Sequence, residues 1–276
     1  MKYFKLILVF ISLFLGFSSS FSQTKIMSYN IRYDTPNDGD NWWELRKDEV
    51  VELLKYYSPD FIGIQEAMPN QLKFVANNLD KYNYIGYGRD GLGTNSEGVP
   101  LFYNSDNYQL LGQEVFWLSE TPQKISKGWD ADFKRIVVYG KFKTKKSNQI
   151  VHIFNTHFDH KGENARLKSA ELIVDYINKN QLADKKIVLM GDLNCLPSES
   201  PIKLLEQEFK NSYKIKSASV YGPIGTFNRF NTMKAATKKI DYIFTKNIDV
   251  KSYRCIDDRR KNNLNLSDHF PIIIEI

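Results

Sequence analysis

Six apolar runs of this chain end in polar residues that a buried strand would not ordinarily carry. Each places an Asn, Asp, Glu or His where a hydrophobic run meets a polar loop. Burying such groups without partners is unfavourable, by roughly several kcal/mol for a charge. Because this pattern occurs six times, we expect the strand ends to converge on one polar site. The segments are Tyr29-Asn30-Ile31, Ile64-Gln65-Glu66, Asn155-Thr156-His157, Met190–Asn194, Lys239–Tyr242 and Leu266–His269.

The segments between these points predict a mixed α/β fold. Apolar residues at helical spacing predict helices over Asn41–Tyr57, Pro69–Leu79 and Glu163–Asn180. Strands outnumber helices, which favours two packed sheets with helices on their outer faces. The predicted strands are Thr24–Tyr33, Asp60–Gln65, Gly98–Tyr103, Tyr108–Leu118, Phe133–Phe142, Ile150–His157, Lys186–Met190, Ile240–Phe244, Val250–Cys255 and Phe270–Ile276.

The N-terminus has the pattern of a secretory signal peptide. Lys2 and Lys5 precede the apolar stretch Leu6–Phe17, and a small, polar segment follows up to Gln23. The apolar stretch is shorter than the roughly 20 residues of a membrane-spanning helix, although an uncleaved anchor is an alternative. We therefore predict a signal peptide over residues 1–23 and an exported, periplasmic or secreted, single domain over residues 24–276, without stable membrane insertion.

Charge and cysteine content limit the function further. Losing Lys2 and Lys5 with the signal peptide lowers the formal net charge from +6 to +4. Such mild basicity suits an anionic substrate, but the scattered lysines do not form a nucleic-acid-binding tract. Cys195 and Cys255 are too few for a cysteine-type zinc site, and we expect two unpaired thiols.

Fragments at the strand ends carry a resemblance to a known superfamily. Y-N-I-R-Y-D, Q-E, N-T-H-F-D-H, G-D-L-N, K-I-D-Y-I-F and S-D-H-F-P occur in this order from Ile26 to the end of the chain. Together they resemble the endonuclease/exonuclease/phosphatase superfamily, and the residues around them are similar to an exported bacterial branch of it. The resemblance implies a four-layer α/β/β/α sandwich of two mixed sheets with outer helices, whose site lies at one end of the paired sheets.

The resemblance implies metal-dependent hydrolysis of a phosphate ester. Mg²⁺ prefers oxygen ligands and retains bound waters, so one or two carboxylates suffice; Mn²⁺ or Ca²⁺ are alternative ions. Glu66 matches the principal ligand, Asn30 would offer a carbonyl oxygen beside it, and Asp268 would be a further acidic ligand, direct or through water. An alternative role for Glu66 is a first-turn acid of the following helix.

The remaining motif positions imply the catalytic groups. Asp192 matches a water-activating aspartate and Asn194 its orienting partner, although an Asx-turn would also explain G-D-x-N. His157 and His269 match two histidines that face the phosphate and stabilise its developing charge. Asp241 matches the partner of His269, and Glu97 looks like the partner of His157. His269 is also a candidate general base.

Other residues near these motifs are candidates for substrate binding. Arg135 aligns with an arginine near the phosphate, with a surface salt bridge as its alternative role. Phe227 would stack on a substrate or pack beside the site. Arg32, Asp159 and His160 lie close enough in sequence to shape the pocket.

These residues favour a phosphomonoesterase or phosphodiesterase that acts as a monomer on small or sugar-linked phosphoesters. An exported endonuclease or exonuclease with a DNA or RNA substrate is the alternative. A non-catalytic binding protein is disfavoured, because the polar set is complete.

Overall fold

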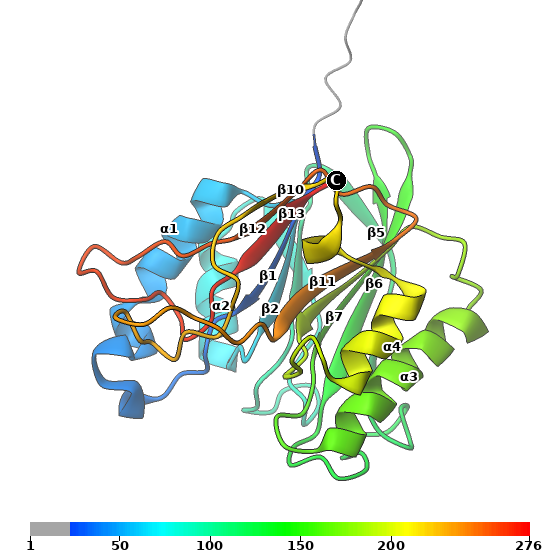
Figure 1. The fold of residues 1–276 in the computed structure, drawn as a ribbon, viewed down its shortest axis with the longest axis horizontal. Coiled ribbons are helices and arrows are strands. Elements are labelled where there is room, and N and C mark those ends of the chain that lie inside the picture. Colours follow the sequence, from blue (N-terminus) through cyan, green and yellow to red (C-terminus); the bar gives the residue numbers. More distant parts are fainter. Residues whose placement is uncertain (1–22) are drawn as a thin grey trace, which may run out of the picture.

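The structure is a computed structural model that describes residues 23–276, and it consists of two β-sheets packed face to face with helices outside (Figure 1). The predicted signal peptide lies, apart from Gln23, outside the described residues. One sheet has seven strands in the order β10-β12-β13-β1-β2-β4-β3, and the other has six in the order β5-β6-β7-β8-β11-β9. The expectation of two packed mixed sheets is confirmed.

The strands of the two sheets have the following bounds. The seven-stranded sheet contains β1 (Lys25–Asn30), β2 (Phe61–Gln65), β3 (Tyr82–Ile85), β4 (Leu101–Asn104), β10 (Ser219–Tyr221), β12 (Ser252–Cys255) and β13 (Ile272–Glu275). The six-stranded sheet contains β5 (Tyr108–Trp117), β6 (Ile136–Thr144), β7 (Ile150–His157), β8 (Ile187–Asp192), β9 (Lys210–Asn211) and β11 (Asp241–Lys246).

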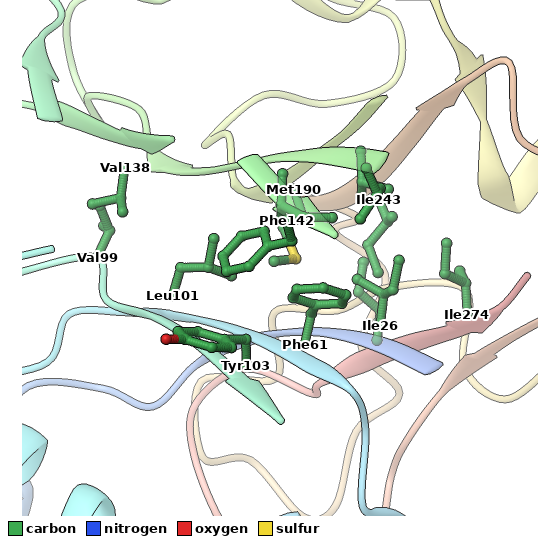
Figure 2. Packing of buried hydrophobic residues seen from close by; sticks show 14 of the residues in the cluster. Ile26, Phe61, Val99, Leu101, Tyr103, Val138, Phe142, Met190, Ile243 and Ile274 are labelled. Carbon is green, nitrogen blue, oxygen red and sulfur yellow. The ribbon is translucent and has the colours of Figure 1, made fainter. Parts of the chain in front are cut away.

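The main core lies between the sheets. Ile26 and Phe61 from the seven-stranded sheet face Phe142, Met190 and Ile243 from the other sheet (Figure 2). Successive strand residues point to opposite faces, so alternate residues of the same strands face the helices. Both faces are buried, which explains why these strands read as continuous apolar runs in the sequence.

Two helices cover each outer face. On the seven-stranded sheet these are α1 (Lys47–Tyr57) and α2 (Pro69–Asn78), and on the six-stranded sheet α3 (Glu163–Lys179) and α4 (Ser200–Glu208) (Figure 1). In α3, Ala170, Ile173 and Ile177 supply the buried stripe against the sheet.

Several predicted boundaries were wrong. The first helix begins at Lys47 rather than Asn41, because two short 3₁₀ helices, Pro36–Asn41 and Trp43–Leu45, precede it and Arg46 has a non-helical φ of −130°. Strand β6 begins at Ile136 rather than Phe133. The short elements β3, β9, β10 and α4 have too few residues for a clear period, and the sequence did not indicate them.

Strand directions explain why the polar segments meet. The pairs β1–β2 and β7–β8 are parallel, whereas β13 and β11 run antiparallel to β1 and β8. The carboxyl ends of the parallel strands therefore lie at the same end of the sandwich as the amino ends of β11 and β13. In this register His157 and Asp241 both stand opposite Asp192.

Within residues 23–276, no helix combines the length and hydropathy needed to cross a membrane. Cys195 and Cys255 are buried and free, as predicted. Burial raises the pKa of both thiols to about 12, so they remain protonated at neutral pH.

Candidate active site

Two acidic side chains and a histidine form the centre of the site. Glu66 directly follows β2, while Asp192 and His157 end β8 and β7, and one potential ligand atom from each lies within 4.8 Å of the others. Asn30, at the end of β1, donates from Nδ2 to Oε1 of Glu66 at 2.9 Å and to Oδ2 of Asp192 at 3.0 Å. Its amide thus connects the two carboxylates.

The orientation of Asn30 differs from the sequence prediction. Its Oδ1, which we expected to face a metal ion, accepts a hydrogen bond from the backbone N–H of Arg32 at 2.9 Å. Two carboxylate acceptors lie on the other side, so the amide turns its NH₂ group toward them. Asn30 in this structure therefore positions Glu66 and Asp192, and its role as a metal ligand stays a prediction.

Strained backbone conformations occur around this centre. Arg32, Glu66 and Asn194 have positive φ values of 58°, 62° and 50°. Such values cost non-glycine residues about 1–3 kcal/mol each and persist where the surrounding structure imposes them. At Glu66 the turn is stabilised by the backbone N–H of Tyr33, which donates to Oε2 at 3.0 Å. The fold thus holds the Glu66 carboxylate in one position.

His269 is held by a dedicated carboxylate. Its Nδ1 lies 2.9 Å from Oδ2 of Asp241, the partner that the sequence predicted, and its Nε2 lies 3.7 Å from Oδ2 of Asp192. Burial alone would lower the pKa of this imidazole, but Asp241 and Asp192 together raise it well above its ordinary value. These two carboxylates therefore favour the protonated imidazole of His269.

His157 faces the same carboxylate in a different environment. Its Nε2 lies 3.5 Å from Oδ2 of Asp192 and 3.1 Å from Nδ2 of Asn194. Burial lowers the pKa of His157 well below its ordinary value, and Arg135 and His269 lower it further. A neutral imidazole with unprotonated Nε2 can accept the hydrogen bond from Asn194.

The predicted pairing of Glu97 with His157 was wrong. Glu97 forms a bidentate ion pair with Arg89, with Nη1–Oε2 and Nη2–Oε1 distances of 3.0 and 2.9 Å. Glu97 still lines a small hollow together with Glu66 and His157. The carboxylate selects Arg89 because the planar guanidinium matches both of its oxygens at once.

The concentration of negative charge fits a divalent cation. Burial raises the pKa of Asp192 to about 7, with repulsion from Asp241 as the next cause. Burial also raises the pKa of Asp268; the neighbouring His269 opposes this shift, and Glu66 adds to it. A bound cation would relieve this repulsion, and carboxylate oxygens are the ligands that hard divalent ions prefer. Glu66 and Asp192 are the residues that would hold it, with Asp268 nearby but outside the tight group of ligand atoms.

The structure brings Arg135, Asp159 and His160 together, but Asp159 is committed to the protein itself. Asp159 accepts from the backbone N–H groups of Phe133, Lys161 and Gly162 at 3.1, 3.0 and 2.8 Å. Burial alone would raise the pKa of Asp159, yet these donors hold it well below its usual range. Asp159 therefore links the segment that carries Arg135 to the loop that carries His160, and its contact with substrate stays a prediction.

Arg32 and Phe227 lie at the edge of the site with much of their surface already in contact. Arg32 forms a bidentate pair with Asp38 at 3.0 and 3.1 Å, and its Nη1 lies 4.0 Å from Glu66. The ring of the half-buried Phe227 packs on His269 with 4.9 Å between ring centroids. Arg32 thus contacts Glu66, and Phe227 contacts His269.

Sequence reasoning missed Arg89, and for Arg46 it left open whether the side chain shapes the pocket or braces loops. No motif surrounds Arg89, and only the acid it pairs with was a candidate. Arg46 is fully buried and donates to the backbone carbonyls of Asn41, Ile31, Leu266 and Arg32 at 2.6–3.0 Å. It thereby ties the chain after Asn30 to the segment before Asp268. A buried position could not be recognised without the tertiary structure.

Comparisons with known proteins agree with this geometry. Residues 27–269 match the model of the Endonuclease/Exonuclease/phosphatase family. An endonuclease/exonuclease/phosphatase from Bacteroides vulgatus is 36% identical, with a TM-score of 0.86 and coverage of 92% of this chain and 98% of that one. A mannosyl-6-phosphatase from Bacteroides thetaiotaomicron is 31% identical, with a TM-score of 0.85 and coverage of 92% and 99%. An uncharacterized protein of Acanthamoeba polyphaga mimivirus is 30% identical over 84% of this chain and 91% of its own length.

Proposed function

Because the chain belongs to the Endonuclease/Exonuclease/phosphatase family, whose members hydrolyse phosphoester bonds, we propose that it is a Mg²⁺-dependent phosphomonoesterase that acts on a sugar phosphate. The observation that carries this proposal is the placement of Glu66, Asp192 and His157 around one point, with the His269–Asp241 pair beside them. Two carboxylates that can hold a cation and a charged imidazole are what an anionic phosphoester requires.

The choice of a sugar phosphate rests on two observations. The mannosyl-6-phosphatase matches this chain along almost its whole length at 31% identity. The mature chain is also only mildly basic and has no basic stripe that would follow a polynucleotide. An exported nuclease is the alternative, and its activity on DNA or RNA would fall steeply with salt, since phosphate contacts release counterions.

The residues of the site divide the chemistry between them. A bound Mg²⁺ would supply charge neutralisation at the phosphate. Asp192 accepts the proton of the attacking water, and Asn194 helps to fix the direction of attack. His269 holds the proton that the leaving oxygen requires, and Asp241 keeps its imidazole charged. His157 and Arg135 face the phosphoryl oxygens from the other side.

The test uses purified mature protein with p-nitrophenyl phosphate, bis-p-nitrophenyl phosphate, mannose 6-phosphate and plasmid DNA. Each substrate is assayed with Mg²⁺, Mn²⁺ or Ca²⁺ and with a chelator. We expect Mg²⁺-supported release of phosphate from the sugar phosphate, abolished by chelator and restored by added Mg²⁺. Hydrolysis of DNA alone would favour the nuclease, and chelator-insensitive hydrolysis would contradict the proposed metal dependence.

We also propose that the protein is exported and works as a monomer. The basic, apolar and polar order of residues 1–23 supports export. Expression of the full chain in a bacterial host, followed by fractionation and N-terminal sequencing, should place a shortened chain outside the cytoplasm, starting near Gln23. Cytoplasmic, full-length protein would contradict export, and light scattering would test the monomer.

A further inference from the structure

A second arginine lies beside the site on the side of His157. Arg89 and Arg135 come from different loops, yet both guanidinium groups contact the same ring: their Cζ atoms lie 4.5 and 5.9 Å from the centroid of Phe133. Both arginines also line the small hollow that contains Glu66 and His157. We call Arg89, Glu97, Phe133 and Arg135 the arginine flank.

Arg89 is held more firmly than an ordinary surface arginine. Besides the bidentate pair with Glu97, its backbone N–H donates to the carbonyl of Glu97 at 2.9 Å, and its own carbonyl accepts from Nε1 of Trp117 at 2.8 Å. The ring of Phe133 covers one side of the guanidinium. A guanidinium group fixed in this way loses little conformational entropy when it binds a ligand.

The guanidinium groups of Arg89 and Arg135 repel each other, and Asp159 and Glu97 oppose this repulsion. Arg135 is buried and has only long contacts, 3.5 Å to Asp159 and 3.4 Å to His160. Burial lowers the pKa of Arg135, and repulsion from Arg89 is the next cause. Two cations beside one hollow attract a doubly charged anion more strongly than a singly charged one.

The hollow also limits the shape of that anion. Its volume is about 10 Å³, which is about the room that one water molecule needs. A phosphate with one ester substituent can direct its free oxygens here. A diester has one free oxygen fewer to offer and carries one negative charge instead of two.

We propose that Arg89, oriented by Glu97, is a specificity-determining residue that binds free oxygens of a dianionic terminal phosphate together with Arg135. This inference rests on the proposed function and deepens it: the arginine flank selects monoesters over diesters. Arg89 has no part in the proton transfers, which the proposed function assigns to Asp192 and His269.

The test compares Arg89→Gln, Arg89→Lys and Glu97→Gln with the wild type in the presence of Mg²⁺. The control is Arg254→Gln, since Arg254 also contacts aromatic rings, Tyr57 and Tyr221, and pairs with an acid, Asp258. The measurements are kcat and KM for p-nitrophenyl phosphate and bis-p-nitrophenyl phosphate, and the inhibition and calorimetric binding constants of inorganic phosphate.

For Arg89→Gln we expect roughly 10-fold or weaker phosphate binding and a roughly 10-fold lower monoester-to-diester ratio of kcat/KM, in line with the loss of a charge-assisted contact. Arg89→Lys should recover part of the phosphate binding and part of the monoester-to-diester ratio. Glu97→Gln should lower kcat/KM for the monoester by less than Arg89→Gln does, through a higher KM. The control should match the wild type.

Equal losses on both esters, or unchanged phosphate binding, would overturn the proposal and leave Arg89 as a loop brace. A wild type that hydrolyses neither ester would refute the proposed function instead. Calorimetry with inorganic phosphate would then still decide whether Arg89 binds the anion.

Discussion

His157 and His269 approach the same oxygen of Asp192 from two flanks, at 3.5 and 3.7 Å, yet their pKa values shift in opposite directions. Both are buried, so burial lowers the pKa of each. At His269 two carboxylates overcome this effect. At His157 the nearby arginines reinforce it. Burial lowers the pKa of both histidines, and the neighbouring charges decide whether that shift is reversed, as at His269, or reinforced, as at His157.

This difference assigns the two flanks different chemistry. A charged His269 can donate a proton and stabilise negative charge, whereas a neutral His157 leaves the positive charge of its flank to Arg135 and Arg89. In the proposed reaction both flanks would offer positive charge to the phosphate, and the His269 flank would supply the acid that protonates the leaving oxygen.

Removing the shared partner should have the largest effect. Asp192→Asn eliminates the base between the two histidines and one candidate metal ligand, so we expect kcat to fall by roughly 10³-fold, in the range of general-base loss. Steady-state kinetics at saturating Mg²⁺ measure this, with circular dichroism as a control for folding. A loss of less than 10-fold would mean that the base lies elsewhere.

Removing the carboxylate that partners His269 should cause the next largest loss of kcat. Asp241→Asn keeps the shape but removes the carboxylate at Nδ1, so the pKa of His269 should fall and kcat should drop by roughly 10². NMR titration of the ring protons and kinetics measure the two effects. If the pKa of His269 stayed high, Asp192 alone would account for its charge.

On the His157 flank the informative change is removal of a neighbouring cation. Arg135→Gln removes a cation that disfavours protonation of His157, so its pKa should rise while burial keeps it below the ordinary value. We expect kcat/KM for a monoester to fall by roughly 10-fold, mainly through KM, since a charge-assisted contact is lost. An unchanged NMR titration of His157 would refute the assigned role of Arg135.

Substitution of His152 should have the smallest effect on kcat, because this residue is buried within β7 away from the motifs. Its Nδ1 forms a hydrogen bond with the hydroxyl of Tyr139 at 2.7 Å. Burial lowers its pKa from 6.5 to about 4. As the pH falls, His152 is therefore protonated in the unfolded chain before it is protonated in the folded protein. The folded protein loses stability relative to the unfolded chain as the pH falls from 6.5 toward 4. His152→Gln should leave kcat within about twofold and flatten the pH dependence of the unfolding free energy in that window. A kcat loss like that of Asp241→Asn would contradict this structural role.

Much of the fold was predictable from local pattern. The runs around Ile26, Phe61, Phe154 and Met190 are apolar on both faces, which is typical of strands buried between a sheet and a layer of helices. The apolar residues of α3 recur at helical spacing, so this helix was equally predictable. The elements that escaped prediction, such as α4 and β3, are short and lie where tertiary contacts outweigh weak local preferences.

The candidate site was predictable as a set but not as a network. Asn30, Glu66, Asp192 and His269 were found from their position at strand ends, and parallel register brings such ends together. The partners of Glu97 and Asp159 were not found. Each of these carboxylates had several donors within reach, and loop conformation decided among them.

The sequence by itself determined the types of residue at the strand ends and hence the chemistry available to the protein. Only the tertiary structure decided which His has a raised pKa, which amide turns its nitrogen toward the carboxylates and which arginines line the hollow beside His157. The physical reason is that strand periodicity depends on adjacent residues, whereas hydrogen bonds and Coulombic shifts depend on distances of a few ångströms between residues far apart in the chain. Ser267 and Asn30, which share a hydrogen bond, are 237 positions apart.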